Sequence, residues 1–119
     1  MTASPLNRNL NESNQLIPEI NLVATIKLTP EHFIQSHQLK FVSGQDDLDS
    51  LIFTSLDLLS GSTISLVRHQ NAPYFGTELY ISPSLSDPSK VLTEALNLLQ
   101  ISKSDLDWIH PQIHLVNLV

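Results

Sequence analysis

The sequence predicts a single α+β domain in which an antiparallel sheet is covered on one face by a C-terminal amphipathic helix. Two stretches of alternating apolar and polar residues meet at a turn, and a third follows after a loop, which predicts a three-stranded meander over about residues 51–82. A segment over about residues 88–101 then carries apolar residues at helical spacing. The chain has 119 residues, 41% of them hydrophobic and 15% charged, which suffices for one small core.

The register of the first hairpin follows from the parity of its residues. Leu56 before the turn and Ile64 after it are both even-numbered. A two-residue turn would pair even with odd positions and split the apolar residues between both faces. A three-residue loop, 59–61, pairs even with even and places Gly61 where a positive φ is needed, so we expect Leu56 opposite Ile64. The expected apolar face is Ile52, Leu56, Leu58, Ile64, Leu66, Leu79 and Ile81, and the expected polar face is Ser55, Asp57, Thr63, Ser65, Glu78 and Tyr80.

The segments before the meander are expected to be shorter and less regular. Residues 1–18 hold four Asn and no apolar period, which predicts a flexible tail ahead of one domain over 19–119. Apolar residues alternate over 22–28, which predicts a strand. Thr29 and Pro30 are typical of the start of a helix, and 39–42 is expected to be a short extended piece.

The predicted helix after the meander has clear signals at its start. Asp87 is expected to be its N-cap and Pro88 its first residue, and its apolar stripe should pack on the sheet. Ser102 and Asp105 have the spacing of a capping box, which predicts one further turn before Trp108, itself expected in the core. Residues 113–119 are almost wholly apolar, so we expect a final strand beside 22–28 or, alternatively, a homodimer contact. The stripe comprises Val91, Leu92, Ala95, Leu96, Leu98 and Leu99.

The charge balance bears on the class of partner. Twelve acidic residues against six basic ones give a net charge of −6, and the six cations are scattered along the chain. Such a chain repels phosphate groups, so nucleic acid and anionic membranes are not expected as partners. The absence of cysteine rules out disulfides and thiolate chemistry, and it favours a cytoplasmic location.

Residues that could carry catalysis or hold a cofactor show no recognisable spacing. Asp46, Asp47 and Asp49 could together hold a hard cation, but they lack the ligand spacing of a calcium loop and are interpreted as a solvated connection. His110 and His114 lie four residues apart with a proline between them, which disfavours a shared helical face. No serine stands in a nucleophile-elbow motif, and no glycine-rich loop could cradle phosphate. We therefore predict no catalytic, cofactor-binding or metal-binding residues.

The loop over 68–76 is the segment most typical of a contact surface, because aromatic residues beside proline offer rigid contact area. The leading hypothesis for the whole chain is therefore a non-catalytic accessory, adaptor or immunity-type protein. It would bind another protein through this loop and the uncovered face of the sheet. Phe75 is expected to tuck over the end of the core, whereas Tyr74 is equally compatible with contact and with packing. The alternative is a small-molecule- or metal-binding regulator, or a minor enzyme, with its site at the rim of the sheet. The candidate binding residues are Arg68, His69, Tyr74, Phe75, Glu78 and Tyr80.

Overall fold

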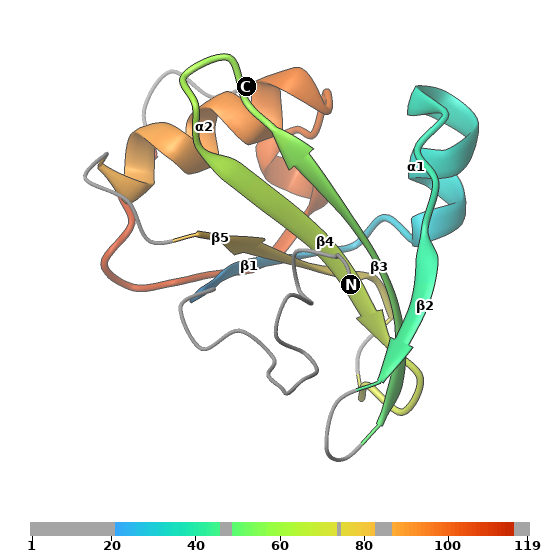
Figure 1. Cartoon of the computed structure of the whole chain (residues 1–119). Coiled ribbons are helices and arrows are strands. Elements are labelled where there is room, and N and C mark those ends of the chain that lie inside the picture. Colours follow the sequence, from blue (N-terminus) through green and yellow to red (C-terminus); the bar gives the residue numbers. More distant parts are fainter. Residues whose placement is uncertain (1–20, 46–48, 74, 83–86, 116–119) are drawn as a thin grey trace.

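The computed structural model describes residues 21–45, 49–73, 75–82 and 87–115, which form an antiparallel six-stranded sheet and two α-helices (Figure 1). The α+β class and the antiparallel sheet are thus confirmed. The strand order is β2-β3-β4-β5-β1-β6, so the sheet extends beyond the strands predicted over 51–82. The predicted tail, 1–18, lies outside the described residues. The elements are β1 (Asn21–Ile26), α1 (Pro30–His37), β2 (Val42–Gln45), β3 (Ser50–Asp57), β4 (Thr63–His69), β5 (Thr77–Ile81), α2 (Pro88–Leu98), the 3-10 turn η2 (Lys103–Asp105) and β6 (Leu106–Ile109).

The β3–β4 hairpin has the register that parity predicted. Leu56 lies opposite Ile64, and the three-residue loop 59–61 closes the hairpin. The Gly61 amide donates to the Leu58 carbonyl at 2.9 Å, and Gly61 adopts a φ of 99°. A type I turn followed by a left-handed residue has this geometry, so the preference of glycine for positive φ fixes the loop length and with it the register.

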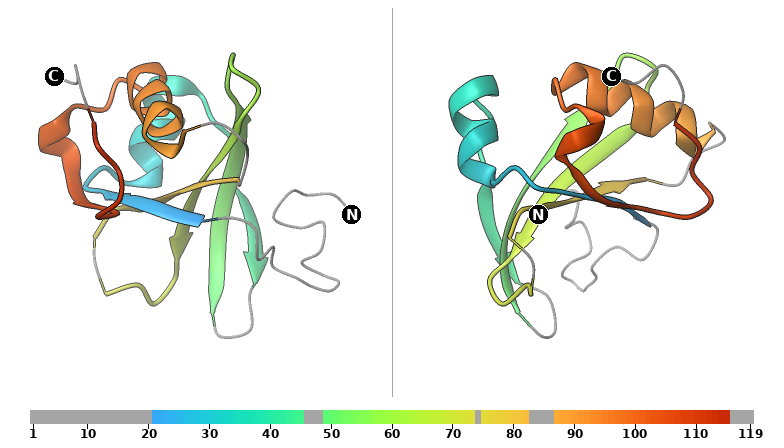
Figure 2. Two further views of the ribbon diagram at one scale, coloured as in Figure 1. Left: turned by 90° about the vertical axis from the view of Figure 1, so that its left-hand side faces the viewer. Right: turned by 180° about the vertical axis from the view of Figure 1, so that it is seen from behind.

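The first face of the sheet carries the main core. Buried side chains from β4 and β5, such as Leu66 and Leu79, share one cluster with Phe33 of α1 and with Leu92 and Leu96 of α2. Both helices therefore lie on the same side of the sheet, as Figure 2 shows. Even-numbered positions of β3 and β4, such as Leu56, Ile64 and Leu66, bring aliphatic side chains to this face, where the apolar stripes of the helices cover them.

The second face, on the other side of the sheet, differs from the expected polar surface. Leu51, Phe53 and Val67 form a small buried cluster there, against which Tyr80 packs. Leu51, Phe53 and Val67 are odd-numbered, as are Ser55 and Ser65. The odd-numbered positions of the β3–β4 hairpin are therefore apolar at one end and polar at the other. Both hydroxyls are used within the sheet, because the Oγ atoms of Ser55 and Ser65 lie 2.8 Å apart.

Strand β1 is inserted between β5 and β6, which corrects the prediction for the C-terminus. Leu106–Ile109 occupies the place beside β1 that was expected for 113–119. The Ser102–Asp105 capping box is present as predicted, and it delivers Leu106 into extended backbone. Pro111 then lacks the amide that further pairing would need. Residues 113–115 are not in a strand, and 116–119 lie outside the described residues.

Helix α2 begins as predicted and ends earlier. The Asp87 carboxylate accepts a hydrogen bond from the Ser89 amide at 2.9 Å, which is N-cap geometry. Gln100, at a φ of 58°, ends the helix in a Schellman motif, in which the Ile101 amide donates to the Leu96 carbonyl at 2.8 Å. The helix therefore stops at Leu98 rather than near 101.

Three local expectations are wrong. The strand predicted over 39–42 lies at Val42–Gln45, because the residues that pair with β3 are Val42, Ser43, Gly44 and Gln45. Leu98, expected within the stripe of α2, is 50% exposed. Trp108, expected in the core, is 41% exposed on β6, at the edge of the sheet, where a strand beyond it is missing among the described residues.

Candidate functional site

Three of the predicted binding residues meet on the second face. His69 Nδ1 lies 2.8 Å from Glu78 Oε1, and the Tyr80 hydroxyl donates to the same oxygen at 3.3 Å. Antiparallel pairing sets Val67 opposite Glu78, so His69, two residues further along β4, reaches Glu78 diagonally on the same face. Glu78 is the more buried of these two side chains, and its carboxylate lies between an imidazole and a phenol.

Arg68 does not belong to this cluster, which corrects the expectation that it would join His69 at the rim. Successive side chains of a strand point to opposite faces, so Arg68 lies on the first face. Its guanidinium donates to the Gly76 carbonyl at 2.9 Å. Arg68 therefore connects the two ends of the 68–76 loop, which is a structural role that its position beside His69 did not indicate.

The 68–76 loop is anchored by further hydrogen bonds. Asp49 accepts from the backbone amide of Asn71 at 2.8 Å and from its side-chain amide at 2.9 Å. The Gln70 amide donates to the Ser50 carbonyl at 2.8 Å. At the far end, Gly76 lies so close to β1 that a Cβ atom would fall 1.8 Å from the Ile26 carbonyl oxygen. Both ends of the loop are thereby fixed to the sheet.

Phe75 projects from this anchored loop. Its side chain is 74% exposed, so the expectation that it would tuck over the core is wrong. Phe75 belongs to neither buried cluster, and the residue after it, Gly76, lies directly against the β1 backbone. Tyr74, its neighbour in the prediction, lies outside the described residues.

One row of side chains on the second face crosses all six strands. The pairings of β2 with β3, β3 with β4, β4 with β5, β5 with β1 and β1 with β6 put these residues side by side. Both ends of the row are apolar and accessible, with Val42 53% exposed on one edge strand. The row comprises Val42, Phe53, Val67, Glu78, Thr25 and Trp108.

The described residues contain no group of three or more His, Cys, Asp or Glu side chains able to hold a metal ion. Asp49 instead accepts the two hydrogen bonds from Asn71 described above. Asp46 and Asp47 lie outside the described residues. His110 Nδ1 accepts a hydrogen bond from the Gln112 amide at 3.1 Å, and His114 contributes its backbone amide to Ser89 Oγ at 2.9 Å. In the part of the chain described, no helix combines the length and apolarity needed to cross a bilayer.

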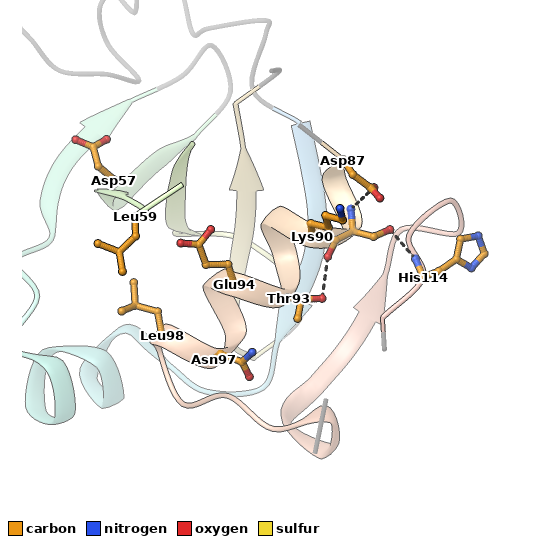
Figure 3. A pocket seen from close by; sticks show the side chains of 10 residues that line it. Asp57, Leu59, Asp87, Lys90, Thr93, Glu94, Asn97, Leu98 and His114 are labelled. Atoms are coloured by element: carbon orange, nitrogen blue, oxygen red, sulfur yellow. Dashed lines mark hydrogen bonds between the residues drawn. The ribbon is translucent and has the colours of Figure 1, made fainter. Parts of the chain in front are cut away.

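A groove between the β3–β4 hairpin tip and α2 is a second candidate site, which the sequence analysis did not identify. It has a volume of about 970 Å³ and is lined by the outer face of α2, by Leu59 and by Asp57 (Figure 3). Leu59 is 100% exposed at the first position of the turn. The sequence did hold one indication of this site, because Leu59 is an aliphatic residue in a turn whose geometry does not require one.

The chain matches no protein-family model, no curated protein and no solved structure with which it was compared. The geometry of the two candidate sites is therefore the basis for the function proposed below.

Proposed function

We propose that this protein is a non-catalytic interaction domain of accessory, adaptor or immunity type, which binds another protein through the 68–76 loop and the second face of the sheet. In this proposal, β3 to β5 form the meander predicted over 51–82, and α2 covers the first face of the sheet. It includes the cytoplasmic location favoured by the absence of cysteine.

The observation that carries this proposal is Phe75 on its anchored loop. An aromatic side chain that is 74% exposed contributes little to the core of its own domain. The contacts of Asp49 with Asn71 and of Arg68 with Gly76 fix both ends of the loop. A pre-ordered aromatic loses little entropy when it binds, and residues of this kind dominate the binding energy of protein interfaces.

We assign the polar part of the contact to the His69–Glu78–Tyr80 cluster on the second face. Its imidazole, carboxylate and phenol can exchange hydrogen bonds with a partner at the edge of an apolar contact. Val42 and Trp108 add exposed apolar area at the two ends of the same face. We therefore place Phe75 at the centre of the contact and the cluster beside it.

The test is affinity purification with the full chain and two matched variants. Phe75→Ala removes the exposed aromatic, and Ile34→Ala removes an exposed aliphatic residue of α1, far from the loop in sequence. We expect a stoichiometric partner with the wild type and Ile34→Ala, and at least tenfold weaker binding of that purified partner by Phe75→Ala in calorimetry. Equal binding by both variants, or no stoichiometric partner, would refute the proposal.

The alternative function is a small-molecule- or metal-binding regulator, or a minor enzyme, and the contact of His69 with Glu78 is the observation that favours it. Arg68 is not part of this proposed site, since its side chain lies on the other face and its guanidinium donates a hydrogen bond to the Gly76 carbonyl. Thermal-shift screening against divalent metals and metabolites separates the two functions. A ligand at a hundredfold excess over its Kd stabilises the fold by about 2.7 kcal/mol, and Glu78→Gln should abolish that shift.

A homodimer through 113–119 is a further proposal about assembly. Light scattering of the full chain against a chain truncated after residue 112 tests it, with a concentration-dependent doubling of mass expected only for the full chain.

A further inference from the structure

The groove between the β3–β4 hairpin tip and α2 has an apolar end made of two leucines. Leu59 is 100% exposed and Leu98 is 50% exposed, and their side chains point toward each other across the groove (Figure 3). Neither side chain is needed to complete the core, because Leu58 and Leu96 fill the buried positions beside them. The two leucines thus offer a place for one aliphatic side chain from outside.

The rest of the groove is acidic. Asp57, Asp87 and Glu94 line it together with Lys90, so its lining carries three carboxylates and one ammonium group, a formal sum of −2 with histidine counted as neutral. A clustered negative charge of this kind attracts cations at its surface. Its complement is a segment that carries more than one positive charge.

The groove is also held in shape. Glu94 of α2 accepts hydrogen bonds from the Ser60 hydroxyl at 2.6 Å and from the Ser60 amide at 3.3 Å. These bonds connect the hairpin tip to the helix, so Leu59 and Leu98 keep their positions relative to the carboxylates. A pre-formed site loses less entropy on binding than one that must assemble.

We propose that this groove binds a short segment of another protein in which an aliphatic residue is flanked by lysines or arginines. The aliphatic side chain packs between Leu59 and Leu98, and the cations meet Asp57, Asp87 and Glu94. A second copy of this chain fits poorly, because its net charge is −6 and its six cations are scattered. Phosphate-bearing partners are repelled by the same carboxylates. The site lies on the hairpin tip and α2, so it is distinct from the surface that carries Phe75.

The probe is a short fluorescein-labelled peptide with one leucine flanked by two lysines on each side, titrated with the full chain at low ionic strength. We expect saturable binding, weakened about five- to tenfold by Leu59→Ser and by up to about fivefold by Glu94→Gln, since exposed ion pairs are individually weak. Asp107→Asn, which removes an exposed carboxylate on β6 outside the groove, is the matched control and should bind as the wild type does. Phe75→Ala should also bind normally, which separates this site from the proposed function.

Several results would overturn the proposal. One is equal binding by Leu59→Ser, Glu94→Gln and the wild type. Another is equal affinity for a peptide in which glutamates replace the lysines, because the charge argument would then fail. Amide chemical-shift changes around His69 and Glu78 instead of Glu94 and Leu98 would place the peptide on the second face. Self-association of the chain that Leu59→Ser abolishes would identify a second copy as the occupant.

Discussion

Gly76 provides the sharpest test of the fold, because its backbone leaves no room for a side chain. A Cβ atom there would lie 1.8 Å from the Ile26 carbonyl oxygen, whereas real Cβ contacts essentially never fall below 3.0 Å. Gly76→Ala must therefore push β1 and β5 apart by about 1 Å. The obstacle is backbone in a paired strand, so a change of rotamer cannot relieve it.

The expected loss of stability follows from the hydrogen bonds next to the clash. Ile26 pairs with Thr77, and the fully buried Thr77 hydroxyl donates to the Leu28 carbonyl at 2.7 Å. A buried polar group that loses its partner costs about 1–3 kcal/mol. Disturbing the ladder and this bond together should lower the free energy of unfolding by about 3–5 kcal/mol.

The other two glycines are matched controls with different physics. At Gly44 the nearest obstacles are side-chain atoms of Phe53 and Leu51 at 3.0 and 3.1 Å, so these atoms need to shift by only a few tenths of an ångström. Gly44→Ala should change the unfolding free energy by less than about 1 kcal/mol, since alanine also restricts the unfolded chain. At Gly61 the space is empty but φ is +99°, so Gly61→Ala should lose about 1–2 kcal/mol.

Urea unfolding measures these differences, followed by circular dichroism and by fluorescence of Trp108, the chain's single tryptophan. Trp108 lies opposite Thr25 of β1, so its fluorescence reports on the part of the sheet that Gly76→Ala disturbs. If Gly76→Ala loses no more stability than Gly44→Ala, the close approach of β5 to β1 is wrong.

Three further substitutions test separate parts of the structure by urea unfolding or hydrogen exchange. Asp87→Ala removes the side chain that caps Ser89 and should lose about 1 kcal/mol, and an unchanged midpoint would contradict the cap. Leu92→Ala leaves a cavity at a side chain that is 0% exposed and should lose about 3–4 kcal/mol; a loss below about 1 kcal/mol would place Leu92 outside the core. Asp49→Ala removes both bonds to Asn71, so the Asn71 amide should exchange with deuterium about fivefold faster or more, while slower or unchanged exchange would show that the loop is anchored elsewhere.

The parts of the fold that the sequence predicted are those encoded by neighbouring residues. The parity of Leu56 and Ile64, with a glycine at 61, determined a hairpin register whose constraints all lie within eight positions along the chain. The Asp87 cap and the Ser102–Asp105 capping box are likewise local hydrogen-bond patterns. Such signals depend on side chains three or fewer residues from their targets, so they can be read from a single chain.

The errors arose where distant pairing decides the outcome. Val42–Gln45 has no apolar alternation, and it is a strand because β3 offers it an edge. Phe53 and Val67 were left out of the predicted faces because their burial depends on cross-strand neighbours of the same parity.

In the candidate site, His69, Glu78 and Tyr80 meet because alternation along β4 and β5 puts them on one face, whereas Arg68, which the prediction grouped with them, lies on the other. The hydrogen bond from Arg68 to the Gly76 carbonyl and the exposure of Phe75 could not be predicted, because no residue spacing in the sequence encodes the path of the 68–76 loop.

The strand order also determines which strands can pair first while the chain is being synthesised. Leu56 and Ile64 are eight positions apart, whereas Ile26 and Thr77 are fifty-one apart. Closing the longer loop carries an extra entropic barrier of about 1.6 kcal/mol on a logarithmic length dependence. Among the described strands, β1 is synthesised before β3 and β4 and yet docks on β5 after the β3–β4 hairpin has formed its own pairing.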